Sequence, residues 1–339
     1  MFTRRGLLKT LSGVAIYPPL MNAQERASIS DEELTTNLLS TPGPTFRIGE
    51  AALEQSWTLI AYGDMRFTDP ANEKVANPKV RRWLVDRIAS EHPDVVLLSG
   101  DVPYDGSDTN DYEVFYQETR AWREARLHVY PAMGNHELHG GEVRDPKNWW
   151  HEFPELKGRR WYSVAMPHAY VISLDSNLSL LEGSRQQRWL LDQLEHLPEE
   201  TLFVFLSLHH PPVADSIEGD HSHDVRPNER ALVVLLEKEA ASSSAKFIVV
   251  AGHIHNYERF LESGVTYLVS GGGGAKPHPI ARTAADLYKD TGFPNYHYVK
   301  FTHDREGLAA QMYRVEAPDA AAAAWEIKDR FAILSPRHR

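Results

Sequence analysis

Cysteine is absent from the 339-residue sequence, which excludes disulfide bonds and thiolate metal ligands. Long apolar runs are absent too: the stretch over residues 11–21 falls well short of the roughly 20 residues that span a bilayer. Positive charge is in deficit, since 36 Lys and Arg residues face 47 Asp and Glu residues and leave a net charge of -11. We therefore expect no nucleic-acid partner and no stable membrane insertion, because nucleic acids and anionic membranes are bound by clustered cations.

The remaining composition is that of a globular protein with a substantial core, with 42% hydrophobic and 24% charged residues. Residues with metal-binding side chains recur from Asp64 to His255, which leaves no room for a separate catalytic half. We expect one large α/β domain over residues 57–315, preceded by a linker or edge extension over 24–56. A C-terminal helix and tail are expected over 316–339, because Asp319 can cap the alanine run 320–324.

The first 23 residues resemble a twin-arginine export signal. Arg4 and Arg5 are followed by Gly6, two leucines and the short apolar stretch, and Ala23 is the expected last residue of the signal. Such a protein would use the twin-arginine export machinery as a partner and would be periplasmic or secreted. The alternative is a cytosolic chain that begins with a basic segment.

Five short apolar runs have the length and composition of buried strands, and each is followed by a residue that can bind a metal. In open α/β sheets the ligand site lies beyond the carboxyl ends of the strands, so these residues should converge there. Oxygen and imidazole donors of this kind bind metal ions. The runs cover residues 57–63, 95–100, 128–134, 202–208 and 247–252, and the residues that follow are Asp64, Asp101, Asn135, His209 and His253.

Helical spacing between these runs predicts crossover helices and a partly parallel sheet. Apolar residues at 161–164 and 169–174 predict an antiparallel hairpin, which implies a second sheet. Another strand is expected over 265–270, and the glycines at 271–274 predict a tight loop beside the site, since the Lys and Ser or Thr of a P-loop are missing. The predicted helices cover residues 79–90, 111–125, 185–197 and 228–240.

Five local motifs occur in the order and strand context of the calcineurin-like metallophosphoesterases, and the resemblance covers roughly residues 57–275. Gly-Asn-His-Glu followed by Gly-His-x-His is its most specific part. Within this superfamily the chain is most similar to the purple acid phosphatases, through the segments 100–104 and 252–259. The motifs are Gly63-Asp64, Gly100-Asp101, Gly134-Asn135-His136-Glu137, His209-His210-Pro211-Pro212 and Gly252-His253-Ile254-His255.

The resemblance implies an α/β fold, a four-layer αββα sandwich with two mixed β-sheets flanked by helices, and a dinuclear metal centre. The implied cofactors are two metal ions, Fe with Zn, Mn or a second Fe. Carboxylate, phenolate, amide and imidazole donors suit these ions. The implied ligands are the bridging carboxylate Asp101, then Asp64, Tyr104 and His255 at the first metal, and Asn135, His209 and His253 at the second.

Four further histidines are predicted to contact the substrate. His136 follows a ligand and could donate a proton to the leaving alkoxide or stabilise the phosphoryl oxygens; a buried structural histidine is the alternative. His210 stands beside His209, and the two could exchange the roles of ligand and neighbour. His221 and His223 follow in a polar loop, about where plant-type members of the family place substrate-facing histidines, although exposed loop histidines are usually solvated.

Arg66 departs from the family pattern. Purple acid phosphatases have glycine at this position and most other metallophosphoesterases have a metal-binding histidine, whereas arginine stays protonated and cannot coordinate. Either Tyr104 replaces the missing ligand, or the first site is short of protein donors. Arg66 would then bind the substrate phosphate through its fork of N–H donors, or form a salt bridge with Asp105 or Glu137.

These residues predict a metal-dependent phosphoric ester hydrolase of the acid phosphatase type, with Asp101, His136 and Arg66 as catalytic residues. A metal-bound hydroxide would attack a small phosphate monoester without a covalent enzyme intermediate. Metal ligands alone do not distinguish one ester bond from two, so a phosphodiesterase of the same superfamily is the first alternative. The second is a non-catalytic envelope protein that binds a ligand on a decayed phosphoesterase fold, with Arg66 as its only support.

Overall fold

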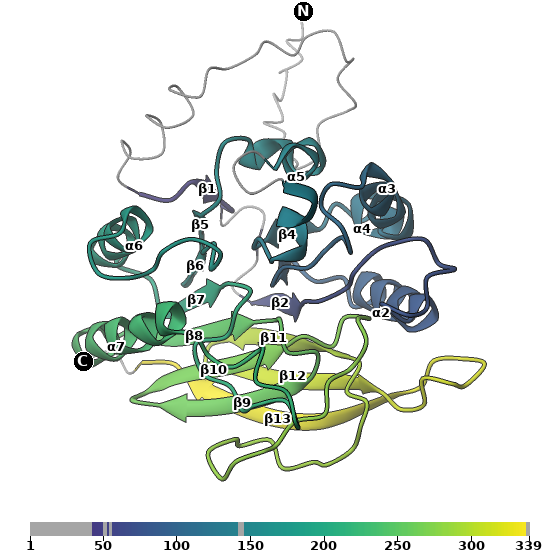
Figure 1. Ribbon diagram of the computed structural model, residues 1–339. Coiled ribbons are helices and arrows are strands. Elements are labelled where there is room, and N and C mark those ends of the chain that lie inside the picture. The colour runs from purple at the N-terminus through teal and green to yellow at the C-terminus, as the bar shows by residue number, and fades with distance from the viewer. Residues whose placement is uncertain (1–42, 50–52, 54–55, 142–145, 337–339) are drawn as a thin grey trace, which may run out of the picture.

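Two β-sheets pack face to face in the computed structural model, and helices cover both outer faces (Figure 1). The structure describes residues 43–49, 53, 56–141 and 146–336. The expected export signal over 1–23 and most of the expected linker over 24–56 lie outside the described residues. The four-layer αββα sandwich predicted from the sequence is confirmed.

One sheet has six strands, and its parallel half begins the site. Its strands are β2 (Trp57–Tyr62), β3 (Val95–Leu98), β4 (His128–Pro131), β11 (His297–Asp304), β12 (Gly307–Val315) and β13 (Trp325–Leu334). Their order across the sheet is β13-β12-β11-β2-β3-β4, in which β2, β3 and β4 are parallel and the other three are antiparallel neighbours. The carboxyl ends of β2, β3 and β4 therefore lie at one edge.

The other sheet has seven strands and contains the predicted hairpin. Its strands are β1 (Phe46–Arg47), β5 (Tyr162–Met166), β6 (Ala169–Ser173), β7 (Phe203–Ser207), β8 (Lys246–Ala251), β9 (Tyr257–Glu262) and β10 (Val265–Ser270). The order is β1-β5-β6-β7-β8-β10-β9, with β5 antiparallel to β6 and with β6, β7, β8 and β10 parallel. Because β1 pairs with β5, the described end of the 24–56 segment is an edge extension of this sheet.

Helices form the two outer layers (Figure 1). On the six-stranded sheet lie α2 (Pro78–Ser90), α3 (Thr109–Glu118) and α4 (Arg120–Glu124), with α5 (Lys147–Glu152) beside α3, and on the seven-stranded sheet lie α6 (Arg185–Glu195) and α7 (Pro227–Ser242). The single helix expected over 111–125 is therefore two helices. Thr119 ends α3 because its hydroxyl donates to the carbonyl of Phe115 at 2.6 Å and its backbone leaves helical geometry.

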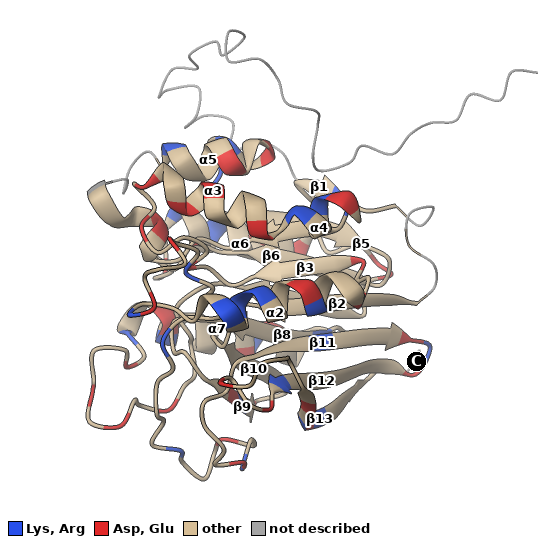
Figure 2. Ribbon diagram, turned by 90° about the vertical axis from the view of Figure 1, so that its right-hand side faces the viewer, with Lys and Arg blue, Asp and Glu red and all other residues tan. Residues whose placement is uncertain are grey.

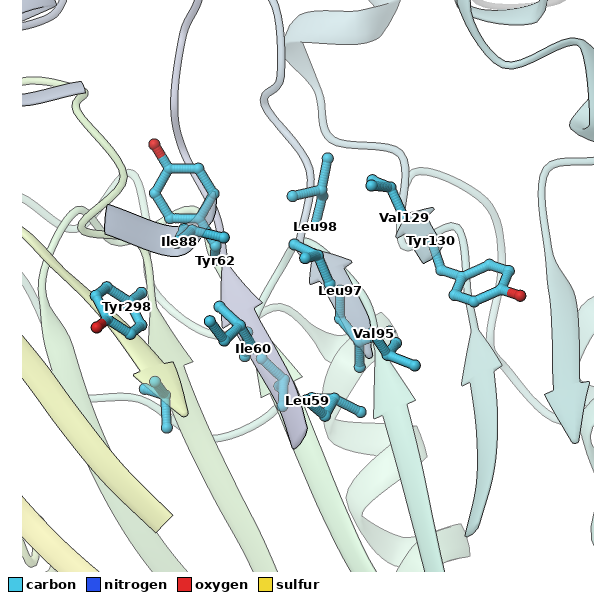
Figure 3. Close-up of a cluster of buried hydrophobic side chains, with 14 of the residues drawn as sticks. Leu59, Ile60, Tyr62, Ile88, Val95, Leu97, Leu98, Val129, Tyr130 and Tyr298 are labelled. Atoms are coloured by element: carbon cyan, nitrogen blue, oxygen red, sulfur yellow. The ribbon is translucent and has the colours of Figure 1, made fainter. Parts of the chain in front are cut away.

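Strand β2 is buried on both faces, which explains its continuous apolar sequence. Trp57 faces the other sheet, with its ring 6.3 Å from that of Phe205, whereas Tyr62 faces the helices, 6.2 Å from Trp122. Figure 3 shows neighbouring core side chains, among them Leu59 and Leu97, which have no exposed surface. Burying a side chain of this size contributes about 1.5–3 kcal/mol, so the strands that carry the site are held firmly.

The prediction of a C-terminal helix within residues 316–339 is wrong for the described part of that range. Residues 316–324 are irregular, and β13 follows them along the edge of the six-stranded sheet. The alanine run is too short to form a stable helix alone. Apolar residues at alternate positions, Trp325, Ile327, Phe331 and Ile333, pair instead with β12, so the sheet extends beyond the boundary predicted at residue 315.

No helix in the described part of the chain has the length and apolar character needed to cross a membrane. In the view of Figure 2, Lys and Arg residues are interspersed with Asp and Glu residues over α2 to α5. The charges on that face are therefore of mixed sign.

Candidate metal centre

The five strand-end residues predicted to bind metal converge at one edge of the sandwich. Three follow strands of the six-stranded sheet and two follow strands of the seven-stranded sheet. Ligand atoms of Asp64, Asp101 and His209 lie within 4.8 Å of one another, as do those of His209, His210 and His253. Because His209 belongs to both groups, the two sheets supply one continuous cluster of donors.

The backbone is left-handed at three of these residues, with φ of 60° at Asp64, 53° at Asp101 and 71° at His253. This conformation costs about 1–2 kcal/mol for a residue other than glycine, and such strain concentrates at functional sites. A Cβ atom at Gly252 would lie 2.3 Å from Asp64 Oδ2, and one at Gly134 would lie 2.3 Å from Asp101 Oδ1. Glycine is thus required at positions 134 and 252 by the close approach of the two carboxylates.

His209 has its imidazole oriented by the protein backbone. Its Nδ1–H donates to the carbonyl of Ser99 at 2.9 Å, so the neutral ring has its lone pair on Nε2. That Nε2 lies 3.0 Å from Asn135 Oδ1 and 3.3 Å from Asp101 Oδ1. Three acceptor atoms therefore face one another, which is the arrangement that a bound cation would satisfy.

His255 repeats this arrangement at the other end of the cluster. Its Nδ1–H donates to the carbonyl of Lys276 at 2.7 Å. Its Nε2 is buried, makes no hydrogen bond within the described residues and lies 3.5 Å from Asp64 Oδ1. A buried acceptor without a donor is costly unless a metal ion binds it.

The buried carboxyl groups of Asp64 and Asp101 need nearby positive charge if both are to ionise. Burial raises the pKa of Asp64 to about 8, even though His209 lowers it and the backbone N–H of His253 donates to both of its oxygens. Burial acts on Asp101 as well, but nearby His209, His136 and Arg66 outweigh it and hold the pKa of Asp101 below its usual range. Because each negative charge opposes the other, Asp64 and Asp101 do not readily ionise together unless cations are bound. This is what a metal centre would provide.

The donor set as a whole fits two metal ions. Buried carboxylates, an amide oxygen and imidazoles suit Fe, Mn or Zn. Tyr104 is half-buried with its ring 5.5 Å from that of His136, and its hydroxyl group makes no hydrogen bond within the described residues. Ligation by Tyr104 and the identity of both metals stay predictions.

Comparison with known proteins identifies the family. Residues 62–257, more than half of the chain, match the family described as calcineurin-like phosphoesterase. The chain belongs to this family. The matched range includes every predicted ligand from Asp64 to His255, and the resemblance drawn from the motifs is confirmed.

Relatives in this phosphoesterase family include enzymes of two kinds. A probable glycerophosphodiester phosphodiesterase, GpdQ, of Arcobacter nitrofigilis is 26% identical over 58% of this chain and 67% of its own length. Purple acid phosphatase 1 of Ipomoea batatas is 25% identical over 64% of this chain and 45% of its own length. The phosphoenolpyruvate phosphatase of Allium cepa is 25% identical over 56% of this chain and 38% of its own length. The chain thus spans less than half the length of these two plant relatives.

Solved structures of other phosphoesterases share the fold. A purple acid phosphatase from yellow lupin, PPD1, superposes with a TM-score of 0.63 at 18% identity, covering 87% of this chain and 55% of that one. A dimetal phosphatase from Danio rerio superposes with a TM-score of 0.52 at 14% identity, covering 86% of this chain and 100% of that one. The architecture of two mixed sheets flanked by helices is therefore that of the family.

His136 lies beside the ligands of this phosphoesterase and is itself buried. Its Nδ1–H donates to the carbonyl of Tyr104 at 2.5 Å, and its backbone N–H donates to Asp101 Oδ1 at 3.0 Å. Its Nε2 is 3.7 Å from Asp101 Oδ2, and burial lowers the pKa of His136 to about 4. The structure thus places His136 next to the predicted bridging carboxylate, as the sequence indicated.

Glu137 organises the centre, a role that the sequence interpretation did not assign. Its Oε2 accepts from the backbone N–H groups of Asp101 at 3.1 Å and Gly134 at 2.8 Å, and its Oε1 accepts from Val102 at 2.8 Å. These bonds join the loops after β3 and β4. Burial and the charge of Asp101 raise the pKa of Glu137 to about 8, although the backbone N–H groups that donate to it favour the ionised carboxylate. Glu137 is the last residue of the Gly-Asn-His-Glu motif, which was the sequence signal that could have revealed this role.

Arg66 pairs with a different carboxylate from those predicted. Its Nη2 lies 3.4 Å from Asp101 Oδ2 rather than at Asp105 or Glu137, and its side chain is 16% exposed. Its Nε is buried without a hydrogen-bond partner in the described part of the chain. The salt bridge therefore involves the carboxylate expected to bridge the metals. The two residues lie side by side, since the backbone N–H of Arg66 donates to the carbonyl of Asp101 at 3.0 Å.

The other predicted histidines differ in their distance from the centre. His210 is buried, with Nδ1 2.8 Å from Ser176 Oγ and its ring 4.3 Å from that of His253, but only His209 joins the carboxylate group, which favours His209 as the ligand. His223 lies over His253, with ring centroids 4.6 Å apart. His221 is 79% exposed and contacts Asp224, so its place does not support a substrate role.

A pocket adjoins the His253 side of the centre. It is lined by His210, His223 and His253 together with Arg226, which pairs with Glu229. The pocket offers imidazole, hydroxyl, carboxylate and guanidinium groups to a bound molecule.

His278 lies beside the centre, and no sequence motif pointed to it. Its ring stacks on that of His255, with centroids 4.0 Å apart and planes at 20°, and lies 5.0 Å from the ring of His223. Burial and the neighbouring His255, His223 and Arg66 lower the pKa of His278 to about 3.

Proposed function

We propose that the chain hydrolyses small phosphate monoesters at a dinuclear metal centre, as purple acid phosphatases do. The observation that carries this proposal is the paired orientation of His209 and His255, whose Nε2 lone pairs are directed toward buried carboxylates by backbone carbonyl groups. When bound, two metal ions would polarise the phosphoryl group and supply an activated water molecule. We propose Fe with Zn, Mn or a second Fe as the pair.

Arg66 and His136 are proposed to contact the substrate, because both reach Asp101 Oδ2, at 3.4 and 3.7 Å. The guanidinium group of Arg66 can bind two phosphoryl oxygens at once. The Nδ1 atom of His136 is held by the carbonyl of Tyr104, so Nε2 is the atom left to face the substrate. In its protonated form Nε2 would donate to the leaving oxygen.

Charge supports a monoester rather than a diester. Two divalent cations and Arg66 would outweigh the negative charges of Asp64 and Asp101, which leaves a surplus of positive charge in a buried place. A monoester dianion gains more from that surplus than a diester monoanion.

A phosphodiesterase is the second candidate, and one observation favours it. This chain covers 67% of the glycerophosphodiester phosphodiesterase relative but only 45% of the Ipomoea batatas purple acid phosphatase. Since the ligands serve both reactions, the preference depends on the loops around the centre.

A parallel assay on 4-nitrophenyl phosphate and bis(4-nitrophenyl) phosphate tests the proposal, with metal-replete protein and metal content measured on the same sample. We expect the higher kcat/KM with the monoester. Asp101→Asn and His253→Ala should lose most activity and bound metal while circular dichroism stays unchanged, and the exposed His221→Ala should behave as the wild type. A higher kcat/KM with the diester would favour the second candidate, and metal binding without any turnover would indicate a non-catalytic ligand-binding protein.

A further inference from the structure

Each histidine of the Gly-His-x-His motif is covered by a second imidazole from a different loop. His278 stacks on His255 at 4.0 Å, and His223 lies over His253 at 4.6 Å. The two covering rings are 5.0 Å apart. They form a wall of imidazoles on the side of the centre that the motif histidines occupy.

Three hydrogen bonds fix the position of His278. Its backbone N–H donates to the carbonyl of His255 at 3.1 Å, and its carbonyl accepts from Asn256 Nδ2 at 2.6 Å. The backbone N–H of His255 donates to Nδ1 of the His278 ring at 3.2 Å. Because Nδ1 accepts, the neutral ring carries its hydrogen on Nε2, and Nε2 makes no hydrogen bond within the described residues.

The loop that carries His278 is pinned by buried carboxylates. Asp215 Oδ2 accepts from the backbone N–H of Thr283 at 2.7 Å, and Asp286 pairs with Arg282. Arg282 Nη2 in turn donates to Asn256 Oδ1 at 3.1 Å, which orients the amide that holds His278. The ring is therefore held in place before any substrate arrives, as a recognition group should be.

We propose that His278 determines substrate specificity by donating its Nε2–H to an oxygen of the leaving group. The proposal rests on the proposed function, in which Arg66 and His136 hold the phosphoryl group at Asp101. His278 lies against His255 and 5.0 Å from the ring of His223, which lines the pocket beside the centre, so a leaving group that occupies this pocket comes close to His278. The substrates favoured are monoesters whose leaving group carries a carboxylate or another acceptor oxygen close to the ester bond.

Two matched esters test this assignment: 2-carboxyethyl phosphate, which has the acceptor, and propyl phosphate, which lacks it. For His278→Phe, which keeps a flat ring on His255, we expect kcat/KM for the carboxyethyl ester to fall about tenfold while that for the propyl ester changes little. His278→Gln, which restores an N–H donor, should recover part of the loss. Metal content and the inhibition constant of inorganic phosphate should be unchanged in both variants.

The outcomes separate the role of His278 from the function of the centre. If the wild type hydrolyses both esters and His278→Phe leaves the ratio of their kcat/KM values unchanged, the specificity role is wrong and the proposed function stands. An equal loss for both esters together with lost metal would make His278 a support for His255 only, and would also overturn the specificity role. If the metal-replete wild type hydrolyses 4-nitrophenyl phosphate but neither of these esters, the specificity role alone is wrong. If it hydrolyses none of the three, the proposed function fails and the role of His278 with it.

Discussion

Arg66 Nη2 lies 3.4 Å from Oδ2 of Asp101, so a fixed cation is paired with the carboxylate expected to bridge two metal ions. The other oxygen of Asp101 faces different partners, with Oδ1 3.3 Å from His209 Nε2 and 3.0 Å from the backbone N of His136. A carboxylate offers about four lone-pair positions in total, so Asp101 can accept from Arg66 on one side and bind metal on the other. The ion pair and the metal centre are thus compatible.

Arg66→Ala should weaken substrate binding more than metal binding. Loss of a charge-assisted hydrogen bond corresponds to about 1.5–3 kcal/mol, so we expect KM to rise roughly 10- to 100-fold with metal content unchanged. Steady-state kinetics and metal analysis on the same preparation measure both quantities. Arg66→Lys keeps the charge but not the paired N–H donors, so its KM should lie between those of the wild type and Arg66→Ala. Loss of metal with unchanged KM would show that the guanidinium only supports Asp101.

Glu258→Gln should change how stability depends on pH. Glu258 is fully buried; burial first, and then the charges of Asp286 and Asp215, raise its pKa well above the ordinary value of 4.5. The folded state therefore holds Glu258 in its protonated form. Its contribution to the free energy of unfolding is highest at low pH and falls as pH rises from the ordinary pKa of glutamate through the raised pKa of the folded state. A glutamine keeps the bond from the backbone N–H of Asp215 and cannot ionise.

Urea unfolding between pH 5 and pH 8 measures this effect. Relative to the wild type, Glu258→Gln should gain stability as pH rises, by at most about 1.4 kcal/mol per pH unit. Glu258→Leu is the matched control, since it removes the acceptor for Asp215 and should be destabilised throughout the range. A constant difference between Glu258→Gln and the wild type would contradict a raised pKa.

The strand ends could be predicted because each combines two independent local signals, an apolar run and a metal-binding residue, and Asp64 and His253 follow that pattern. The position of His278 could not, since it lies in an irregular loop 23 residues beyond His255 and is placed by hydrogen bonds with His255 and Asn256. Strand β13 was missed for a similar reason: it begins after the alanines, at Trp325, and its residues are held as a strand by pairing with β12. Side-chain partners such as that of Arg66 depend on loop conformation, which carries no period in the sequence.

The export prediction concerns Arg4 and Arg5, which lie outside the described residues. Replacing both by Lys keeps the charge but should remove the twin-arginine address. We expect the variant precursor to accumulate in the cytoplasm, while the wild type appears in the periplasm or medium, as measured by immunoblots of cell fractions. Normal export of the double-Lys protein would show that the N-terminus is not a twin-arginine signal.

We expect Tyr104 to determine whether the iron-loaded protein is coloured. It stands three residues after Asp101, half-buried, and its hydroxyl group has no hydrogen-bond partner in the described chain. A phenol becomes a phenolate ligand only beside a strongly polarising ion such as Fe(III), and that bond absorbs visible light. Iron-loaded protein should therefore be purple or pink, and Tyr104→Phe should abolish the absorption band while Arg66→Ala keeps it. A colourless iron-loaded wild type, or a band that survives in Tyr104→Phe, would mean that Tyr104 is not a ligand, and Fe(III) would then lack the phenolate that distinguishes purple acid phosphatases within the family.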